Sequence, residues 1–307
     1  MTKRCAIIAG KPAESWNAIE AMTINISAAK DTLAAGQVVH LRQGVSLQVC
    51  HSPGQSPAIV FLHGGMGNRF NLRSQYDFFA QQGREVLAYD LAGHGQSSAY
   101  RRYSLGRHRR DLSRLLARFQ ISAPVLCCHS YGVPIGLEWI RRNPASALIA
   151  IAGGTHDLAP WWEVPSMKLL AWGGRHFYRL PCVQQLTNYF STSRRHEVMQ
   201  QFFAECPVPV ESDPYQALEI FWSYNFFRRD APHLNSSLPV LVISGGKDPM
   251  FTHKMGEELA ACFPLGKHLH LPDAGHLVMA EYPDVVNRAI AQVLLPAESA
   301  SQSCTNK

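Results

Sequence analysis

The sequence predicts an α/β fold built on a doubly wound, mostly parallel sheet. Short apolar runs without polar alternation recur along the chain, as expected of strands that are buried on both faces of a sheet. Stretches in which apolar residues follow a helical spacing separate these runs. The chain has 307 residues, of which 46% are hydrophobic, so it is long enough to bury the core that such a sheet requires.

Each expected element follows from one such segment. Buried strands are expected at 58–62, 85–89, 124–128, 147–152, 239–244 and 267–271, and helices at about 72–82, 105–119, 131–142, 253–262 and 281–294. Before them, the runs 38–42 and 45–50 flank Gln43-Gly44 and predict an opening hairpin. An antiparallel edge of this kind is common on a parallel sheet.

The alternation of strands and helices stops after Gly153-Gly154 and resumes near Leu238. The intervening stretch is rich in Trp, Phe and Tyr, and has helix-like pieces at 165–172, 193–204 and 214–227. We interpret it as a helical cap inserted into the domain; the alternative is a plain continuation of the domain. The expected organisation is a core at 34–153 and 237–296, a cap at 154–236, and two weakly ordered ends at 1–33 and 297–307.

The charge, the cysteines and the lengths of the apolar runs argue against several classes of protein. The net charge is +6, but the arginines fall in short pairs and form no basic stripe, so no nucleic-acid partner is expected. The eight cysteines include no C-x-x-C pair, which favours free thiols and predicts no metal. No apolar run approaches the roughly 20 residues of a membrane span. The apolar run 5–9 is shorter than a signal-peptide core, so we expect a cytoplasmic protein.

A candidate nucleophile follows the strand expected at 124–128. The chain there continues as His129-Ser130-Tyr131-Gly132 and enters a helix, which is the strand-turn-helix context of the G-x-S-x-G nucleophile elbow. Cys128 stands where that motif has its first glycine. The alternative role for Ser130 is that of a helix cap.

A serine hydroxyl needs a base to remove its proton, and a histidine usually serves. His276 follows the strand at 267–271 and precedes the last helix, and the carboxyl ends of parallel strands are where such sheets place their sites. In the chain order Ser, Asp, His, the acid partner lies between them. Asp248, after the strand at 239–244, is our candidate; Asp273 is the second choice, because it lies so close to His276 in the chain.

A glycine-containing loop, 61–68, follows the first buried strand. Backbone N–H groups aimed at an oxyanion stabilise the charge that develops on oxygen when a carbonyl is attacked. We expect the N–H groups of Gly65 and Tyr131 to form this oxyanion hole, and His63 to be a structural residue of the loop. The loop lacks the phosphate-binding pattern G-x-x-x-x-G-K-[ST], so nucleotide binding is not expected.

Taken together, the motifs 63–67, 90–97, 129–132, 246–248 and 275–276 resemble the α/β-hydrolase superfamily, in its order and over about residues 34–296. The runs 90–95 and 129–132 look most similar to its esterases and lipases. The resemblance implies an α/β-hydrolase fold with an inserted cap or lid, a Ser-His-Asp acyl mechanism, and neither cofactor nor metal. It also implies structural roles for Asp90, Gly93 and Gly95. Cys128 departs from the family pattern.

These observations predict a serine hydrolase that cleaves a carboxylic ester or related acyl substrate through an acyl-enzyme, with catalytic residues Ser130, Asp248 and His276. The expected partner is a small acyl molecule, and the aromatic insertion favours an apolar one. The alternatives are a cofactor-free lyase, a haloperoxidase-like enzyme or a carbon–carbon bond hydrolase on the same triad, and a non-catalytic ligand-binding protein. Dehalogenases and epoxide hydrolases are disfavoured because they use Asp where Ser130 stands.

Overall fold

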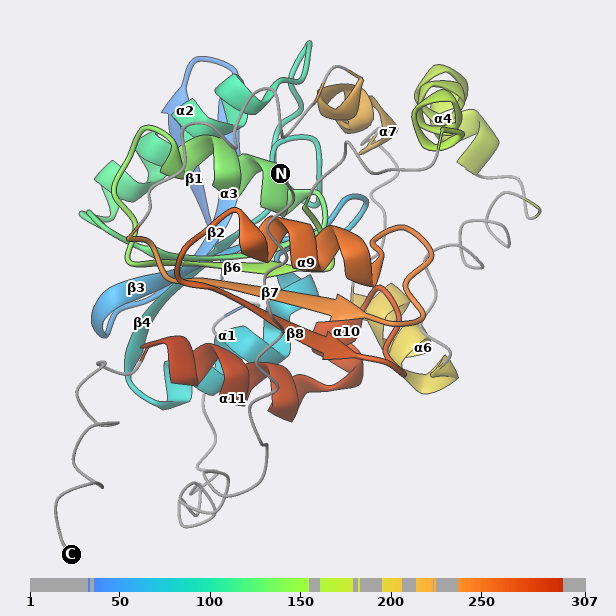
Figure 1. Cartoon of the computed structure of the whole chain (residues 1–307). Coiled ribbons are helices and arrows are strands. Elements are labelled where there is room, and N and C mark those ends of the chain that lie inside the picture. Colours follow the sequence, from blue (N-terminus) through green and yellow to red (C-terminus); the bar gives the residue numbers. More distant parts are fainter. Residues whose placement is uncertain are drawn as a thin grey trace, which may run out of the picture. The chain divides into compact units, whose positions relative to one another are not determined.

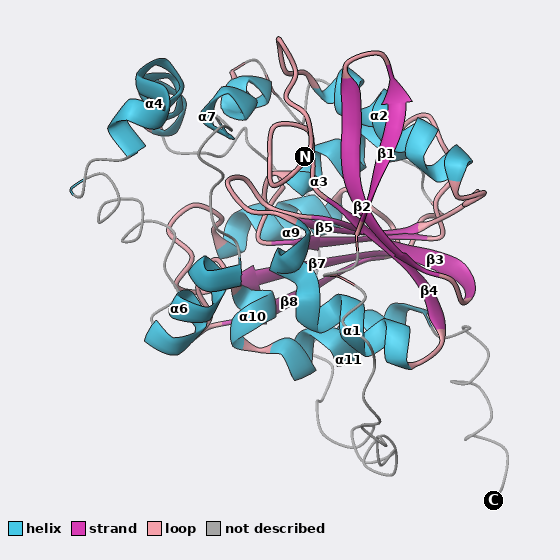
Figure 2. Ribbon diagram, turned by 180° about the vertical axis from the view of Figure 1, so that it is seen from behind, coloured by secondary structure: helices cyan, strands magenta, loops and turns pink. Residues whose placement is uncertain are grey.

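The computed structural model describes residues 33, 36–154, 161–178, 182, 195–205, 214–222, 224 and 237–294. Its sheet has eight strands in the order β1-β2-β4-β3-β5-β6-β7-β8 (Figures 1 and 2). The strands are β1 (Gln37–Arg42), β2 (Val45–Ser52), β3 (Gln55–Leu62), β4 (Arg84–Tyr89), β5 (Val125–His129), β6 (Ala147–Ile151), β7 (Val240–Gly245) and β8 (Gly266–Leu271). The predicted strands are all present, within a few residues of the expected bounds.

The pairing of the strands gives the mixed sheet that the sequence predicts. β1 and β2 form an antiparallel hairpin, and β2 pairs antiparallel with β4. From β4 through β3 to β8 every pair is parallel. The carboxyl ends of β3, β5, β7 and β8 therefore meet at one edge of the sheet.

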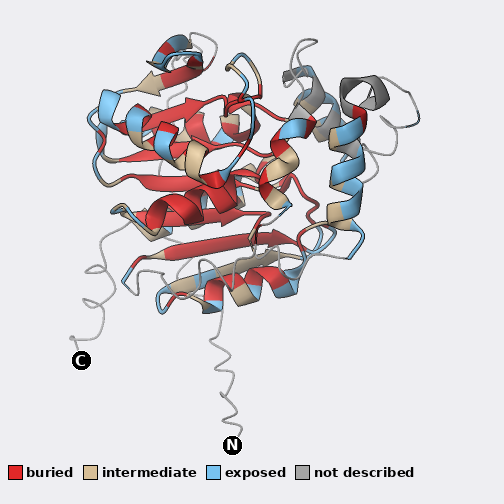
Figure 3. Ribbon diagram, turned by 90° about the horizontal axis from the view of Figure 1, so that it is seen from above, coloured by how far each residue is buried: buried red, intermediate tan, exposed pale blue. Residues whose placement is uncertain are grey.

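Helices cover both faces of the sheet (Figure 1). On one face, α2 (Leu105–Arg118), α3 (Gly132–Ile140) and α9 (His253–Ala261) share a buried cluster with alternate strand residues such as Val60 and Leu62. On the other, α1 (Arg73–Gln81) and α11 (Pro283–Leu294) pack with Ile59 and Phe61. Successive side chains of a strand point to opposite faces, and helices cover both faces. The central strands are therefore buried along nearly their whole length (Figure 3).

The last helix differs from the expected 281–294. It is divided into α10 (Val278–Glu281) and α11 (Pro283–Leu294), with Tyr282 between them at φ −132° and ψ 55°. Pro283 explains the break, because a proline has no N–H to donate and disfavours helical geometry in the residue before it. Proline is well suited to the first position of a helix, where its missing N–H has no partner to lose.

The elements described within 154–236 are helical: α4 (Glu163–Tyr178), α6 (His196–Glu205), α7 (Pro214–Ala217) and the 3-10 helix η3 (Leu218–Phe221). They overlap the three predicted helical pieces, although 193–194, 223 and 225–227 lie outside the described residues. The same holds for 1–32 and 295–307. Leu33 is described and is fully buried. None of the helices among the described residues is long and apolar enough to cross a membrane.

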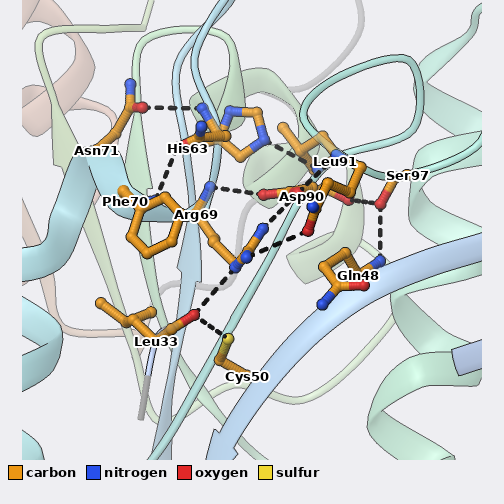
Figure 4. Close-up of polar contacts among 12 residues, drawn as sticks. Leu33, Gln48, Cys50, His63, Arg69, Phe70, Asn71, Asp90, Leu91 and Ser97 are labelled. Atoms are coloured by element: carbon orange, nitrogen blue, oxygen red, sulfur yellow. Dashed lines mark hydrogen bonds and ion pairs between the residues drawn. The ribbon is translucent and has the colours of Figure 1, made fainter. Parts of the chain in front are cut away.

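A buried ion pair fixes the loops at the edge of the sheet where β3 and β4 end (Figure 4). Arg69, at the start of the 3-10 helix η1 (Arg69–Leu72), donates from its backbone N–H and from Nη1 to the two carboxylate oxygens of Asp90, each at 2.8 Å. The N–H of Gln96 also donates to Asp90, at 2.8 Å. Gly95 has φ +51°, and a Cβ there would collide with the Asp90 carboxylate. The structural roles implied for Asp90 and Gly95 are consistent with these contacts.

Candidate active site

Ser130 lies in a strained turn between β5 and α3. Its φ is +46°, a backbone conformation that non-glycine residues rarely adopt. Its N–H donates to the carbonyl of Ile151 at 2.9 Å, and its carbonyl accepts from the N–H of Val133 at 2.9 Å. A Cβ on Gly132 would lie 2.5 Å from the carbonyl oxygen of Leu62, so only glycine fits there. The side chain of Ser130 is held at the edge of the sheet and is partly exposed.

Cys128, the departure from the elbow motif, is accommodated by a glycine in the following helix. A Cβ on Gly136 of α3 would lie 2.6 Å from the Cys128 Sγ, so the missing side chain of Gly136 provides room for the thiol. Burial raises the pKa of Cys128 well above its usual value, which keeps the thiol protonated and unreactive. The elbow therefore keeps its tight turn without a glycine at this position.

Asp248 and His276 are in direct contact at the ends of β7 and β8. The His276 Nδ1 lies 2.8 Å from the Asp248 Oδ2, and both side chains are buried. The other oxygen of Asp248 accepts from the N–H groups of Met250 and Phe251 at 2.8 and 2.9 Å. Three hydrogen bonds thus fix this carboxylate, and its contact holds the imidazole with Nδ1 protonated.

Asp273, the second choice for the acid, lies elsewhere. Its side chain is exposed, and its Oδ1 is 2.6 Å from the Nζ of Lys247. This ion pair lowers the pKa of Asp273. Of the two aspartates considered, Asp248 is thus the one placed against the histidine.

The loop after β3 lies against the elbow. A Cβ on Gly64 would be 3.4 Å from the Cβ of Ser130, and one on Gly65 would be 3.6 Å from the Cβ of Tyr131. The backbones of the two residues expected to form the oxyanion hole, Gly65 and Tyr131, are therefore neighbours. His63 anchors the loop: its Nε2 accepts from the N–H of Leu91 at 2.8 Å, so its Nδ1–H donates to the Gly64 carbonyl at 2.7 Å.

His129 links the elbow to the loop that carries His276, a connection that the sequence analysis missed. Its Nε2–H donates to the backbone carbonyl of His276 at 3.1 Å, and the two rings lie 5.0 Å apart. Ser130 and His276 are thus tied through the residue next to the serine. Histidine in the motif His129-Ser130 was visible in the sequence, but nothing there indicated its partner 147 residues away.

The insertion reaches the same edge of the sheet. The Tyr131 hydroxyl accepts from the His108 Nε2 at 2.9 Å and donates to the carbonyl of Ala217, in α7, at 3.1 Å. Glu163, the first residue of α4, has a pKa raised to about 7 by burial, while His276 lowers that pKa and Asp248 raises it. Glu163 therefore lies within electrostatic reach of the histidine–aspartate pair, and sequence analysis did not single it out.

Four buried histidines around the elbow predict unfolding in mild acid. Burial is the main cause that lowers the pKa of His63 to about 4, of His94 and His108 to about 3, and of His129 well below its usual value. The unfolded chain binds these protons near pH 6.5, so stability falls as the pH drops from about 6.5 to 4. Each histidine contributes a slope of about 1.4 kcal/mol per pH unit; Glu163, with its raised pKa, acts in the opposite direction.

Urea unfolding midpoints measured at several pH values test this. For His108→Gln, we expect the slope of the unfolding free energy against pH to be smaller by the contribution of about one proton. His40→Gln removes an exposed histidine of β1 and should leave this slope as in wild type. A stability that stays constant between pH 6.5 and 4 contradicts the prediction.

Comparisons with known proteins agree with this architecture. A family model described as the alpha/beta hydrolase fold matches residues 57–283. Protein ABHD8 of Mus musculus is 25% identical over 275 residues, or 84% of this chain and 60% of that protein. The chain therefore spans about 60% of the length of this relative. The 3-oxoadipate enol-lactonase 2 of Acinetobacter baylyi is 27% identical over 279 residues, which cover 86% of this chain and 96% of that enzyme.

Solved structures show the same fold. The crystal structure of the enol-lactonase from Burkholderia xenovorans has a TM-score of 0.72 to this chain at 21% sequence identity, and the match covers 84% of this chain and 99% of that one. At this identity the likeness concerns the fold alone. The family model covers most of the described sheet, including the elbow, Asp248 and His276. The chain belongs to the alpha/beta hydrolase fold family.

Proposed function

We propose that this protein is a serine hydrolase that cleaves a carboxylic ester or lactone through an acyl-enzyme. Ser130 is the nucleophile, His276 the general base and Asp248 the residue that orients the base. The observation that carries the proposal is the 2.8 Å contact between His276 Nδ1 and Asp248 Oδ2, at the same sheet edge as the strained elbow at Ser130. A buried carboxylate on one nitrogen of an imidazole leaves the other nitrogen free to accept a proton.

The reaction proceeds in two acyl-transfer steps. His276 Nε2 takes the proton of the Ser130 hydroxyl while Oγ bonds to the substrate carbonyl carbon, and negative charge moves to the carbonyl oxygen. The N–H groups of Gly65 and Tyr131 donate to that oxyanion. The ester C–O bond breaks, and the leaving oxygen takes the proton from His276. Water then loses a proton to His276 and attacks the acyl carbon, the bond between that carbon and Oγ breaks, and Oγ takes the proton back from His276, which releases the acid and regenerates Ser130.

The substrate enters beneath a cap formed by 154–236, while 34–153 and 237–296 form the catalytic core. The contact between Tyr131 and the carbonyl of Ala217 supports this, because it joins the insertion to the elbow. The ring of Phe221, in η3, lies 5.7 Å from the ring of Tyr131 and adds an apolar surface beside the elbow. A relative named as an enol-lactonase favours lactones, which are cyclic esters, among the substrates to test.

Pre-steady-state kinetics with p-nitrophenyl esters of increasing chain length test the proposal. We expect a burst of p-nitrophenol equal to the enzyme concentration, followed by slower turnover, because acylation releases the phenol before water frees the enzyme. Turnover without any burst in rapid-quench measurements, together with no acylated protein by mass spectrometry, contradicts an acyl-enzyme and favours a lyase. No turnover by folded protein on any ester or lactone supports a binding protein instead.

A further inference from the structure

Three histidines meet where α9 crosses the last two strands, outside the site described above. His253 is the first residue of α9, and His268 and His270 lie two residues apart on β8, the edge strand. Figure 1 shows α9 lying over β7 and β8. One ring nitrogen from each histidine lies within 4.8 Å of the other two. His253 is exposed and the other two are half-buried, so solvent reaches the cluster.

Two polar side chains orient these rings. Ser244 of β7 is fully buried, and its hydroxyl lies 2.8 Å from His268 Nε2 and 3.0 Å from His270 Nδ1. The carboxylate of Glu257, one turn along α9, lies 3.1 Å from His253 Nε2. Each of these contacts involves one nitrogen of the imidazole; such a partner orients the ring, and a metal would bind the other nitrogen.

The backbone also makes room for the cluster. A Cβ on Gly256 would lie 2.5 Å from His268 Nε2, so α9 approaches this ring closely only because position 256 carries no side chain. His253 comes three residues before Gly256 in the chain, so the two residues lie on the same side of α9. The missing side chain at Gly256 therefore leaves space for the His268 ring beside α9.

The protonation of the strand histidines suits metal binding. Burial is the main cause that lowers the pKa of His268 to about 4, and it also lowers the pKa of His270; the charges of the neighbouring histidines act in the same direction, and Glu257 opposes them. These lowered pKa values favour the neutral form of both rings. A neutral imidazole has a lone pair for a metal and no proton to lose first.

We propose that His253, His268 and His270 bind one transition-metal ion, with Zn²⁺ as the first candidate. A set of three imidazoles suits Zn²⁺, Cu²⁺ or Ni²⁺, whereas Mg²⁺ and Ca²⁺ prefer oxygen ligands. Zinc–nitrogen bonds of about 2.0–2.1 Å place tetrahedral ligands roughly 3.4 Å apart. The ring nitrogens lie within 4.8 Å of one another, so rotations of the imidazole side chains would bring them to that spacing, and water would fill the fourth position.

The ion would join α9 to β8 and, through Ser244, to β7. It would act as a structural clamp on this corner of the sheet, since its ligands come from a helix and a strand that separate in the unfolded chain. It is not a participant in the acyl chemistry proposed for Ser130.

Calorimetric titration of the full chain, without an affinity tag and after treatment with a chelator, tests the site. At pH 7.5 we expect wild type to bind one Zn²⁺ per chain and to unfold at a higher temperature when zinc is present. His253→Gln, a substitution of an exposed residue that leaves the core intact, should weaken binding at least tenfold, and Ser244→Ala should weaken it by about 10–100-fold. His40→Gln removes another exposed histidine that lies beside a serine, and it should bind as wild type does.

The proposal is overturned if wild type binds no Zn²⁺. It is also overturned if His253→Gln and His268→Gln, both shown to be folded by circular dichroism, bind zinc with wild-type affinity and stoichiometry. In that case the ion lies elsewhere, and the three histidines with Ser244 form a hydrogen-bonded cluster without a metal.

Discussion

Replacing Ser130 with alanine is expected to lower kcat for ester cleavage by about a million-fold, the scale seen when the nucleophile of such a triad is removed. The reason is that alanine has no hydroxyl to form the acyl bond that the proposed mechanism requires. Alanine keeps the Cβ and the backbone of the elbow, and Ser130 sits at φ +46° in wild type, so the variant has the same backbone strain and should fold with nearly unchanged stability.

Ser146→Ala is the matched control for this experiment. Ser146 precedes β6 at the opposite edge of the sheet, where its hydroxyl donates to the carbonyl of Ala123 at 2.8 Å. Its removal is expected to leave kcat unchanged. The double variant Ser130→Ala/His276→Ala should be no slower than Ser130→Ala, because the two residues act as a unit. Ester cleavage by Ser130→Ala at a rate near that of wild type would rule out this serine as the nucleophile.

Replacing Asp248 with asparagine is expected to lower kcat by about ten-thousand-fold, with little change in KM. The amide can donate to His276 Nδ1 and so favours the tautomer in which Nε2 carries the proton, which cannot act as a base. The side chain keeps its size and can still accept from the N–H groups of Met250 and Phe251 through its oxygen. The unfolding midpoint in urea separates a loss of activity from a loss of structure.

Asp273→Asn provides the comparison. Asp273 is exposed and paired with Lys247, so its substitution should leave kcat at the wild-type value. If instead Asp273→Asn were the inactive variant and Asp248→Asn the active one, the assignment of the acid would be wrong. The pair of variants therefore tests the contact between Asp248 and His276 directly.

Most of the fold could be predicted because buried strands and amphipathic helices have distinct periods. α2, predicted at 105–119, is found at Leu105–Arg118, and the opening hairpin is found as β1 and β2. The division of the last helix was missed, since its apolar pattern continues across Tyr282 while Pro283 interrupts the backbone. Pro283 was visible in the sequence and was the clue to this break.

The candidate site could be predicted because the carboxyl ends of parallel strands meet at one edge. From this rule alone, Asp248 and His276 are predicted to lie close together, and they are in contact in the structure. The contact of His129 with the His276 carbonyl and the reach of Glu163 toward that histidine depend on tertiary packing. Neither has a local pattern, so neither could be read from the chain.

The histidine cluster on α9 and β8 could not be predicted either. His253 precedes His268 by fifteen residues, and no spacing motif for metal ligands joins them. His268 and His270, two residues apart on β8, point to the same face of the sheet. The helix that completes the cluster, and the serine beneath it, are brought there by the pairing of β7 with β8.

Covalent labelling with a fluorophosphonate tests the central claim most directly, because this reagent reacts with a serine only when a neighbouring base activates it. We predict one label per wild-type chain, on the peptide that contains Ser130, and no label on folded Ser130→Ala. Labelling that is absent from folded wild type, or that persists in Ser130→Ala, would contradict the assignment of Ser130 as an activated nucleophile.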